Sequence, residues 1–354
     1  NATSIKNECD NPKNGWICSD DFETTKLSNN FQYDDNGGDF LRTANVGVNG
    51  STAMRALWQT GEVSAGNLKL AFGKTPSSYF KPVDSGTQNY RDIYWRMYVK
   101  NQQGWIGGGG DKLSRAVVFA NSNWAEAAIS HVWSMGTSNN YLGLDPASGT
   151  DTSGILKTTQ YNDNANIRWL GAKTGTTSLF DSNHVGQWYC VEAHMKLNDA
   201  DQSNGVNELW INENLESQTT GMNWFGNYND YGINSIFFEN YWNAGSSVQQ
   251  ERNFDNIVVS TQRIGCGSIT STTPPAPAPT LTLTASPTSI TSGQSSTLTW
   301  SSINATSCTA SGGWTGTKST SSSSQSVSPT TTTTYTLTCT GAGGSTSKSA
   351  TVTV

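Results

Sequence analysis

Residues 186–212 read GQWYCVEAHMKLNDADQSNGVNELWIN, and this stretch decides the fold class. Before the polar turn at 198–205, apolar and polar residues alternate, which is the period of a β-strand with one buried face. The apolar positions are Tyr189, Val191, Ala193, Met195 and Leu197. After the turn, Leu209 and Ile211 share one face of a second strand. A hairpin with one apolar face must cover it with a second sheet, so the stretch predicts a β-sandwich.

Short strands are expected on both sides of this hairpin, and no long helical period lies between them. They are 53–59, 67–72, 91–100, 112–120, 126–134, 228–242 and 253–260, with 168–170 as the centre of another and long loops in the rest of 141–180. In 91–100, Ile93 to Val99 alternate with a basic, aromatic face that is suited to a polyanion. About ten short strands are enough for two packed sheets, so we expect an all-β domain.

The composition indicates a secreted protein. The chain has 13 Trp, 12 Tyr and 35 Gly but only 14% charged residues, which is typical of extracellular β-proteins. Its net charge is −6 and it has no run of Lys or Arg, so nucleic acid is not an expected partner. No apolar run approaches the roughly 20 residues that span a bilayer. Because the first residue is not Met, we expect a mature secreted or cell-surface chain that has lost a signal peptide.

The six cysteines fit an oxidising compartment, since none has a metal-type CxxC spacing. Six cysteines allow 15 pairings. Proximity in the sequence and membership of one domain favour the pairs Cys9–Cys18, Cys190–Cys266 and Cys308–Cys339. Free buried thiols are the alternative.

The composition changes after residue 267. Residues 268–280, SITSTTPPAPAPT, predict an extended linker. Residues 281–354 are rich in Thr and Ser, lack His, Asp and Glu, and show period-two patches that predict a second, small β-sandwich. With Trp300 and the span from Cys308 to Cys339, this part resembles the bacterial immunoglobulin-like modules of secreted proteins. We expect a first domain at 1–267 and a spacer or anchor at 281–354.

Four motifs of the first domain carry a second resemblance. They are YWRMYVK at 94–100, GGGGDKLSR at 107–115, NGVNELWIN at 204–212 and NFDNIVVS at 253–260. Together with the hairpin they resemble the concanavalin-A-like jelly rolls of polysaccharide lyases that cut alginate and glucuronan, over most of residues 16–266. The resemblance implies a jelly-roll β-sandwich and cleavage of an acidic polysaccharide by β-elimination. That reaction needs a cation at the uronate carboxylate and a Tyr or His as base and acid.

The candidate site residues follow from this resemblance. The candidate catalytic residues are Arg96, Lys112, Arg115, His131 and Tyr241, and the candidate substrate-binding aromatics are Tyr94, Tyr98 and Trp133. Each has a structural alternative: the tyrosine packs in the sandwich, Arg96 pairs with an acid, and His131 is a satisfied core histidine. His194 shares a face with Glu192 and Lys196, as on a solvated sheet surface.

Hydrolase and metal patterns are sparse. No strand carries the E-x-D-x-x-E pattern of a retaining glycosidase on this fold. The chain also lacks the G-x-S-x-G and H-E-x-x-H motifs. In many jelly rolls, acids of the first and last strands share a structural Ca²⁺, which implies a site at Asp21, Glu23 and Asp255.

Three functions remain open at this point. The first is a secreted lyase of a uronate-containing polysaccharide, and the second is a non-catalytic glycan-binding protein. The third is a structural or adhesive subunit with cell-surface or self-assembly contacts. A lyase requires Arg96, His131 or Tyr241 to meet in one open groove.

Overall fold

The structure is a computed structural model that describes residues 7–107, 110–267, 279–341 and 344–354. The chain divides into two compact units, Asn1–Ser271 and Thr272–Val354. The division falls within the 268–280 stretch predicted as a linker, of which residues 268–278 lie outside the described residues. Within the described ranges, no helix combines the length and apolar character needed to cross a membrane.

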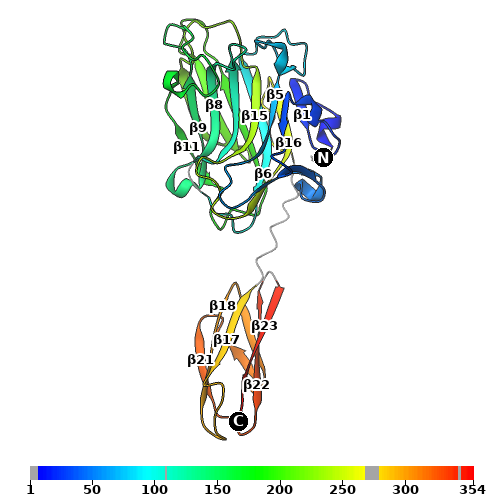
Figure 1. The fold of residues 1–354 in the computed structure, drawn as a ribbon, viewed down its shortest axis with the longest axis vertical. Helices are drawn as coiled ribbons and strands as arrows, with labels where there is room; N and C mark the ends of the chain where they lie inside the picture. The colour runs from blue at the N-terminus through cyan, green and yellow to red at the C-terminus, as the bar shows by residue number, and fades with distance from the viewer. Residues whose placement is uncertain (1–6, 108–109, 268–278, 342–343) are drawn as a thin grey trace. The chain divides into compact units, whose positions relative to one another are not determined.

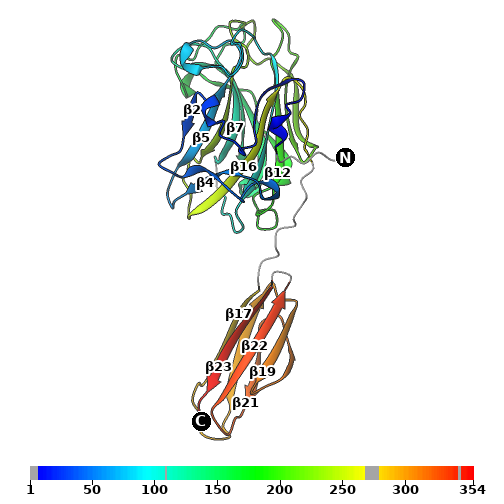
Figure 2. The same ribbon diagram turned by 90° about the vertical axis from the view of Figure 1, so that its right-hand side faces the viewer.

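The first unit is a sandwich of two antiparallel sheets (Figures 1 and 2). The sheet named here the β12 sheet has the strand order β14 (Asn214–Met222), β13 (Gly205–Ile211), β12 (Tyr189–Lys196), β6 (Asp92–Asn101), β16 (Gln250–Ser260), β4 (Ala53–Trp58) and β3 (Phe40–Thr43), with β1 (Trp16–Asp20) paired to β16. The other, the β8 sheet, has the order β10 (Arg168–Trp169), β9 (Tyr141–Ser148), β8 (Glu126–Met135), β7 (Lys112–Phe119), β15 (Ser235–Tyr241), β5 (Ser64–Ala71) and β2 (Gln32–Asp34), with β11 (Lys173–Ser178) paired to β9. The all-β jelly-roll class predicted from the sequence is confirmed.

Six short 3-10 helices connect the strands of this unit in its described part. They are η1 (Glu8–Asp10), η2 (Leu27–Asn29), η3 (Val48–Gly50), η4 (Ser78–Phe80), η5 (Thr137–Asn139) and η6 (Asn164–Asn166).

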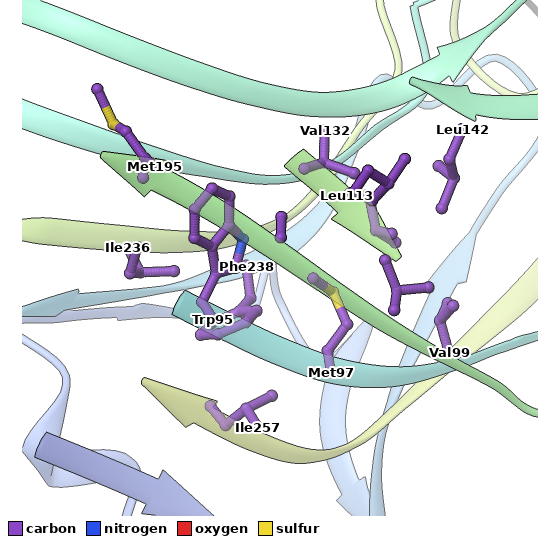
Figure 3. Close-up of a cluster of buried hydrophobic side chains, with 14 of the residues drawn as sticks. Trp95, Met97, Val99, Leu113, Val132, Leu142, Met195, Ile236, Phe238 and Ile257 are labelled. Carbon is purple, nitrogen blue, oxygen red and sulfur yellow. The ribbon is translucent and has the colours of Figure 1, made fainter. Parts of the chain in front are cut away.

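The core lies between the two sheets. The apolar face of β6, Ile93 to Val99, is buried there as the alternation predicted. Figure 3 shows Trp95 and Met97 of β6 close to Leu113 of β7 and Phe238 of β15. The indole Nε1 of Trp95 also donates a hydrogen bond of 3.0 Å to the Ser114 hydroxyl, so a polar contact joins the two sheets inside the core.

The hairpin that decided the fold class forms as predicted. Strands β12 and β13 pair in antiparallel register, with Ala193 opposite Leu209. On its other side β12 pairs with β6, which places Ala193 opposite Trp95. The predicted disulfide between Cys190 and Cys266 is present and ties β12 to the segment that follows β16.

In the first unit, the strands that arise where the sequence predicted loops or no strand include β2, β3, β9, β11 and β14. Strand β9, YLGLDPAS, contains Gly143 and Pro146, which lower strand propensity. It forms because Leu142 and Leu144 are buried in the core and its backbone pairs with β8. Tertiary packing therefore overrides local propensity in this region.

The predicted Cys9–Cys18 disulfide is wrong, since both residues are free thiols in the structure. Cys9 is hydrogen-bonded to the Ser19 side chain, whereas Cys18 packs against the core. Neighbouring residues of a strand point to opposite faces, so the two thiols lie on different sides of β1. Burial raises the pKa of Cys18 to about 12.

The second unit also consists of two antiparallel sheets. One has the order β17 (Thr280–Ser286), β18 (Ser296–Ile303) and β21 (Ser323–Val327), and the other has β20 (Gly316–Lys318), β19 (Ser307–Gly312), β22 (Thr333–Gly341) and β23 (Gly344–Val352). Trp300 and Tyr335 lie in its core. The predicted Cys308–Cys339 disulfide is present, and it joins directly opposite positions of β19 and β22 within one sheet. An antibody domain joins its two sheets instead, so the immunoglobulin-like assignment stays a prediction.

Candidate active site

A cleft of about 620 Å³ opens on the face of the β8 sheet that points away from the core. It is lined by Asp34, Ser64, Gly66, Asn67, Lys69, Lys112, Arg115, His131, Trp133, Tyr161, Asn162, Asn164, Trp169, Glu239, Tyr241 and Asn243. Five of these are predicted site residues: Lys112, Arg115, His131, Trp133 and Tyr241. The structure thus brings together residues that lie as much as 129 positions apart, from Lys112 to Tyr241.

Strand register explains how these side chains meet. One cross-strand row runs through β2, β5, β15, β7, β8 and β9 as Gln32, Lys69, Phe237, Arg115, His131 and Asp145. Residues directly opposite on neighbouring strands share a face of the sheet, and adjacent strands lie about 4.8 Å apart. The row therefore places Lys69, Arg115 and His131 on the same face of the sheet, at the floor of the cleft.

A register irregularity in β7 adds Lys112 to the same face. Lys112 and Arg115 are three positions apart, so a regular strand would point them to opposite faces. The pairing of β7 with β8 shifts between Lys112 and Ser114, which lets both cations line the cleft.

Arg115 is buried and held by acids. Its guanidinium lies 2.8 Å from Glu239 and 3.7 Å from Glu126, and it donates a hydrogen bond to the Tyr161 hydroxyl. Burial opposes its charge, but Glu239, Tyr161 and Glu126 outweigh burial and raise its pKa. Burial also raises the pKa of Glu126 to about 7, although Arg115 acts in the opposite direction. The charge of Arg115 is therefore largely balanced within the protein.

Lys112 differs from Arg115 because, among the described residues, it is not paired with an acid. Its Nζ lies 4.6 Å from the ring centroid of Tyr241. It forms no ion pair or hydrogen bond with any other side chain in the described part of the chain. Burial lowers its pKa, while Glu239 acts to raise it. Lys112 thus presents a cation without a direct anionic partner beside a tyrosine hydroxyl.

His131 is neutral and oriented. Its Nδ1 lies 2.9 Å from the backbone carbonyl oxygen of Asp145. A carbonyl oxygen only accepts hydrogen bonds, so Nδ1 carries the proton and Nε2 keeps a lone pair. Burial lowers the pKa of His131 to about 3, and the positive charges of Arg115 and Lys112 act in the same direction. At neutral pH the imidazole is therefore uncharged, and its Nε2 carries no proton.

Two indoles stand beside His131. The ring of Trp133 stacks on the imidazole at 4.5 Å and 15°. Trp169 of β10 lies 5.7 Å from the imidazole and 6.1 Å from Trp133, and 47% of its surface is exposed. The sequence did not single out Trp169 as a site residue, because the pattern around 168–170 indicates only a strand.

Arg96, Tyr94 and Tyr98 are not brought to the cleft. They lie on β6, in the β12 sheet, on the face away from the core. Contrary to the expected open basic face, Arg96 is fully buried, paired with Glu8, and donates to the carbonyl oxygen of Gly265 at 3.0 Å. The segment after β16 and the residues of η1 cover this face.

His194 lies on the same covered face. It is buried, and its two ring nitrogens lie 2.6 Å from Glu208 and 2.7 Å from Asp92. Its ring stacks on Tyr94 at 3.9 Å. Instead of facing solvent, His194 is therefore buried in a polar cluster, whereas Lys196 of the same face is exposed.

The acids expected to hold calcium are engaged by hydrogen-bond donors. Asp255 accepts bonds of 2.8 Å from the Val48 N–H and the Ser51 hydroxyl. Glu23 and Asp21 each accept a backbone N–H. These donors compete with a cation for the carboxylate oxygens. Within the described residues, no three His, Cys, Asp or Glu side chains form a group able to hold a metal, so these acids as arranged do not fit calcium.

Some cleft residues gave little signal in the sequence. Glu239 could have been noticed as an acid in the apolar strand FFENY, in alternation with Phe237 and Tyr241. Lys69 alternates with core residues in β5 and was treated only as part of a strand. Tyr161 lies outside the strands, so only the structure places it beside Arg115.

These features define a β-sandwich with an open polar cleft on one sheet. No family model and no curated protein sequence matches the chain. Among solved structures, it is similar to an alginate lyase from Chlorella virus, with a TM-score of 0.49, 13% identity, and coverage of 69% of this chain and 99% of that one. It is also similar to an endo-β-1,4-glucuronan lyase from the fungus Trichoderma reesei (TM-score 0.45, 13% identity, 70% and 92% coverage). A marine alginate lyase from Aplysia kurodai gives a TM-score of 0.44 at 10% identity, with 70% and 99% coverage. The activity is therefore inferred from the side chains of the cleft.

Proposed function

We propose that the cleft binds a uronate-containing polysaccharide and cleaves it by β-elimination. One observation carries the proposal: Lys112, a cation without a direct anionic partner among the described residues, lies between a tyrosine, Tyr241, and a neutral histidine, His131, on three adjacent strands of one open cleft. These are the three kinds of group that the reaction requires.

In the proposed reaction, Lys112 pairs with the uronate carboxylate. This contact stabilises the negative charge that develops when the proton on the neighbouring carbon is removed. His131 Nε2 takes that proton. Burial and the charge of Lys112 lower the pKa of His131 in the free protein, and the uronate carboxylate favours the transfer because it offsets that charge. The electron pair of the C–H bond forms a C=C bond, the C–O bond to the leaving sugar breaks, and the leaving oxygen receives a proton from the Tyr241 hydroxyl. Atoms and charge balance without a metal or an external oxidant.

Arg115 has a supporting role in this scheme. Its guanidinium is tied to Glu239 and Glu126, so it adds little net charge to the cleft, and its nearby positive charge helps to keep His131 unprotonated. Lys69 also lines the cleft and donates to Gln32 at 2.6 Å. The cleft therefore attracts an acidic sugar chain more through its lysines than through Arg115.

A glycan-binding function without catalysis is the second candidate. The observation that favours it is the exposed indole of Trp169 beside Trp133, since aromatic faces bind sugars without any chemistry. The third candidate, a structural or adhesive subunit, has no specific contact in its favour. We further propose an extracellular location, with which the two disulfides are compatible.

The test is turnover of alginate, glucuronan and related polyuronates followed by ultraviolet absorbance. β-Elimination creates a C=C bond conjugated with the carboxylate, so absorbance grows with time on polyuronates and stays flat on neutral glucans. Tyr241→Phe keeps the ring over Lys112 and removes the hydroxyl, so turnover falls by about 100-fold or more while the melting temperature is unchanged.

Other results would support a different function. New reducing ends without absorbance indicate hydrolysis, for which Asp34 and Glu239 are the carboxylates of the cleft. Retardation in an affinity gel without any product indicates the binding function. Neither turnover nor binding on a broad panel favours the structural subunit.

A further inference from the structure

The aromatic end of the cleft is built from three rings. Trp133 and His131 stack on each other, and Trp169 lies across both, with interplanar angles of 30° and 32°. His131 is 5% exposed, whereas Trp169 is 47% exposed. The cluster therefore presents an indole to the solvent of the cleft and backs it with two further rings.

The backbone around Trp169 holds this indole in place. Trp169 pairs with Ala147 of β9, and the N–H of Leu170 donates to the carbonyl oxygen of Pro146 at 2.9 Å. Arg168 pairs with Ser148 in the same ladder. An exposed aromatic ring on a paired strand loses little conformational freedom on binding, which favours affinity.

The position of the indole relative to Lys112 follows from strand order. Lys112 of β7 is directly opposite Trp133 of β8, at about one strand spacing of 4.8 Å. Trp169 of β10 lies beyond Trp133, at the edge of the β8 sheet. In contrast, the side of the cleft near β5 and β2 is polar, with Asn67 and Asp34. The two ends of the cleft thus differ in chemistry.

We infer that Trp169, backed by Trp133, is a sugar-stacking subsite for a ring adjacent to the uronate whose carboxylate contacts Lys112. The C–H face of a pyranose ring packs on the exposed indole, and the polysaccharide runs across the strands from the polar end to the aromatic end. This inference rests on the proposed function for the position of the bound uronate. It assigns Trp169 to binding and gives it no part in the chemical step.

The test uses the full chain and oligouronates of two to six sugars, with binding measured by calorimetry and turnover by ultraviolet absorbance. In the unmodified protein, affinity rises when the oligosaccharide becomes long enough to reach Trp169. Trp169→Ala loses this gain, with binding of the longer oligomers weakened roughly threefold to tenfold. Trp169→Phe retains most of the gain, because it keeps an aromatic face.

Leu215→Ala is the matched control. Leu215 is 49% exposed, close to the value for Trp169, but it belongs to β14 of the β12 sheet. This variant keeps the length dependence. The melting temperatures of all variants are measured alongside, so that a loss of fold is recognised as such.

The outcomes separate this inference from the proposed function. Binding that depends on Trp169 without any cleavage supports the subsite and contradicts the lyase. Cleavage with the same length dependence in Trp169→Ala supports the lyase and overturns the subsite. If no oligouronate binds, the same variants are tested with neutral oligosaccharides. Binding of a neutral oligosaccharide that is lost in Trp169→Ala supports the stacking subsite. Binding that persists in Trp169→Ala, or the absence of any binding, overturns it.

Discussion

The two sheets of the first unit carry the same kinds of residue on their outer faces, and the cleft described above lies on the β8 sheet. The β8 sheet has Arg115 and His131, which are directly opposite on β7 and β8. The β12 sheet has Arg96 on β6 and His194 on β12. Both arginines and both histidines are buried.

The two sheets differ in the partners of these polar side chains. On the β12 sheet, Glu192 accepts the backbone N–H groups of Ile264 and Gly265, and so fastens the segment after β16 over Arg96. The Cys190–Cys266 disulfide holds the same segment. On the β8 sheet, Lys112 and the Nε2 of His131 are left for a ligand. A polar sheet face becomes a candidate site only where the protein does not complete its own hydrogen bonds.

The largest effect is expected from removing Lys112, the cleft cation without a direct anionic partner among the described residues. Lys112→Ala lowers turnover of a polyuronate by about 100-fold or more, because the developing charge loses its stabilising partner. The matched control is Lys100→Ala, since the Nζ of Lys100 lies 4.9 Å from the ring of Trp188 on the β12 sheet, much as Lys112 lies over Tyr241. Equal losses in the two variants, measured by ultraviolet absorbance at equal protein concentration, would contradict the distinction between the sheets.

Arg96→Ala is expected to act on stability instead. Removing one partner of a buried ion pair leaves Glu8 uncompensated, so the free energy of unfolding falls by about 3 kcal/mol. Denaturant titration measures this loss, and the turnover per folded molecule stays unchanged. A variant that keeps its stability but loses turnover would move Arg96 back among the catalytic candidates.

Glu126 and His131, both on β8, should change the pH dependence of stability in opposite directions. The raised pKa of Glu126 means that the folded state holds a proton that the unfolded state loses between about pH 4.5 and 7. Glu126 therefore makes the free energy of unfolding fall as the pH rises through that window, by up to about 1.4 kcal/mol per pH unit. Glu126→Gln removes this contribution.

His131 acts with the opposite sign. Its lowered pKa means that the unfolded state binds a proton that the folded state does not between about pH 3 and 6.5, so stability rises with pH in that range. Urea titrations from pH 4.5 to 7 should give a more positive slope for Glu126→Gln and a more negative slope for His131→Gln than for the unmodified protein. Slopes that shift in the same direction would show that one of the two groups is not buried as described.

The smallest effect is expected from calcium. Because Asp255 is already surrounded by hydrogen-bond donors, neither added Ca²⁺ nor a chelator should change the melting temperature appreciably. A clear increase with Ca²⁺ would show by mass action that the native state binds the ion and would restore the predicted site at Asp21, Glu23 and Asp255.

The sequence alone determined the β-class of the protein and much of the core. Alternation of apolar and polar residues identifies the buried face of a strand without any knowledge of its partners, because side chains point to opposite faces with a period of two. The apolar, buried faces of 189–197 and 91–100 were therefore correctly predicted. The resemblance to polysaccharide lyases, and not the alternation, pointed to Lys112, Arg115, His131 and Tyr241, which do meet in one cleft.

Only the tertiary structure decided which polar face is open. Alternation shows that Arg96 points away from the core, but not that η1 and the segment after β16 cover it. The sequence pattern also could not reveal the irregular register that turns Lys112 toward Arg115, or the packing of Trp169 against His131. These features depend on contacts between residues far apart in the chain, and a local period carries no information about such contacts.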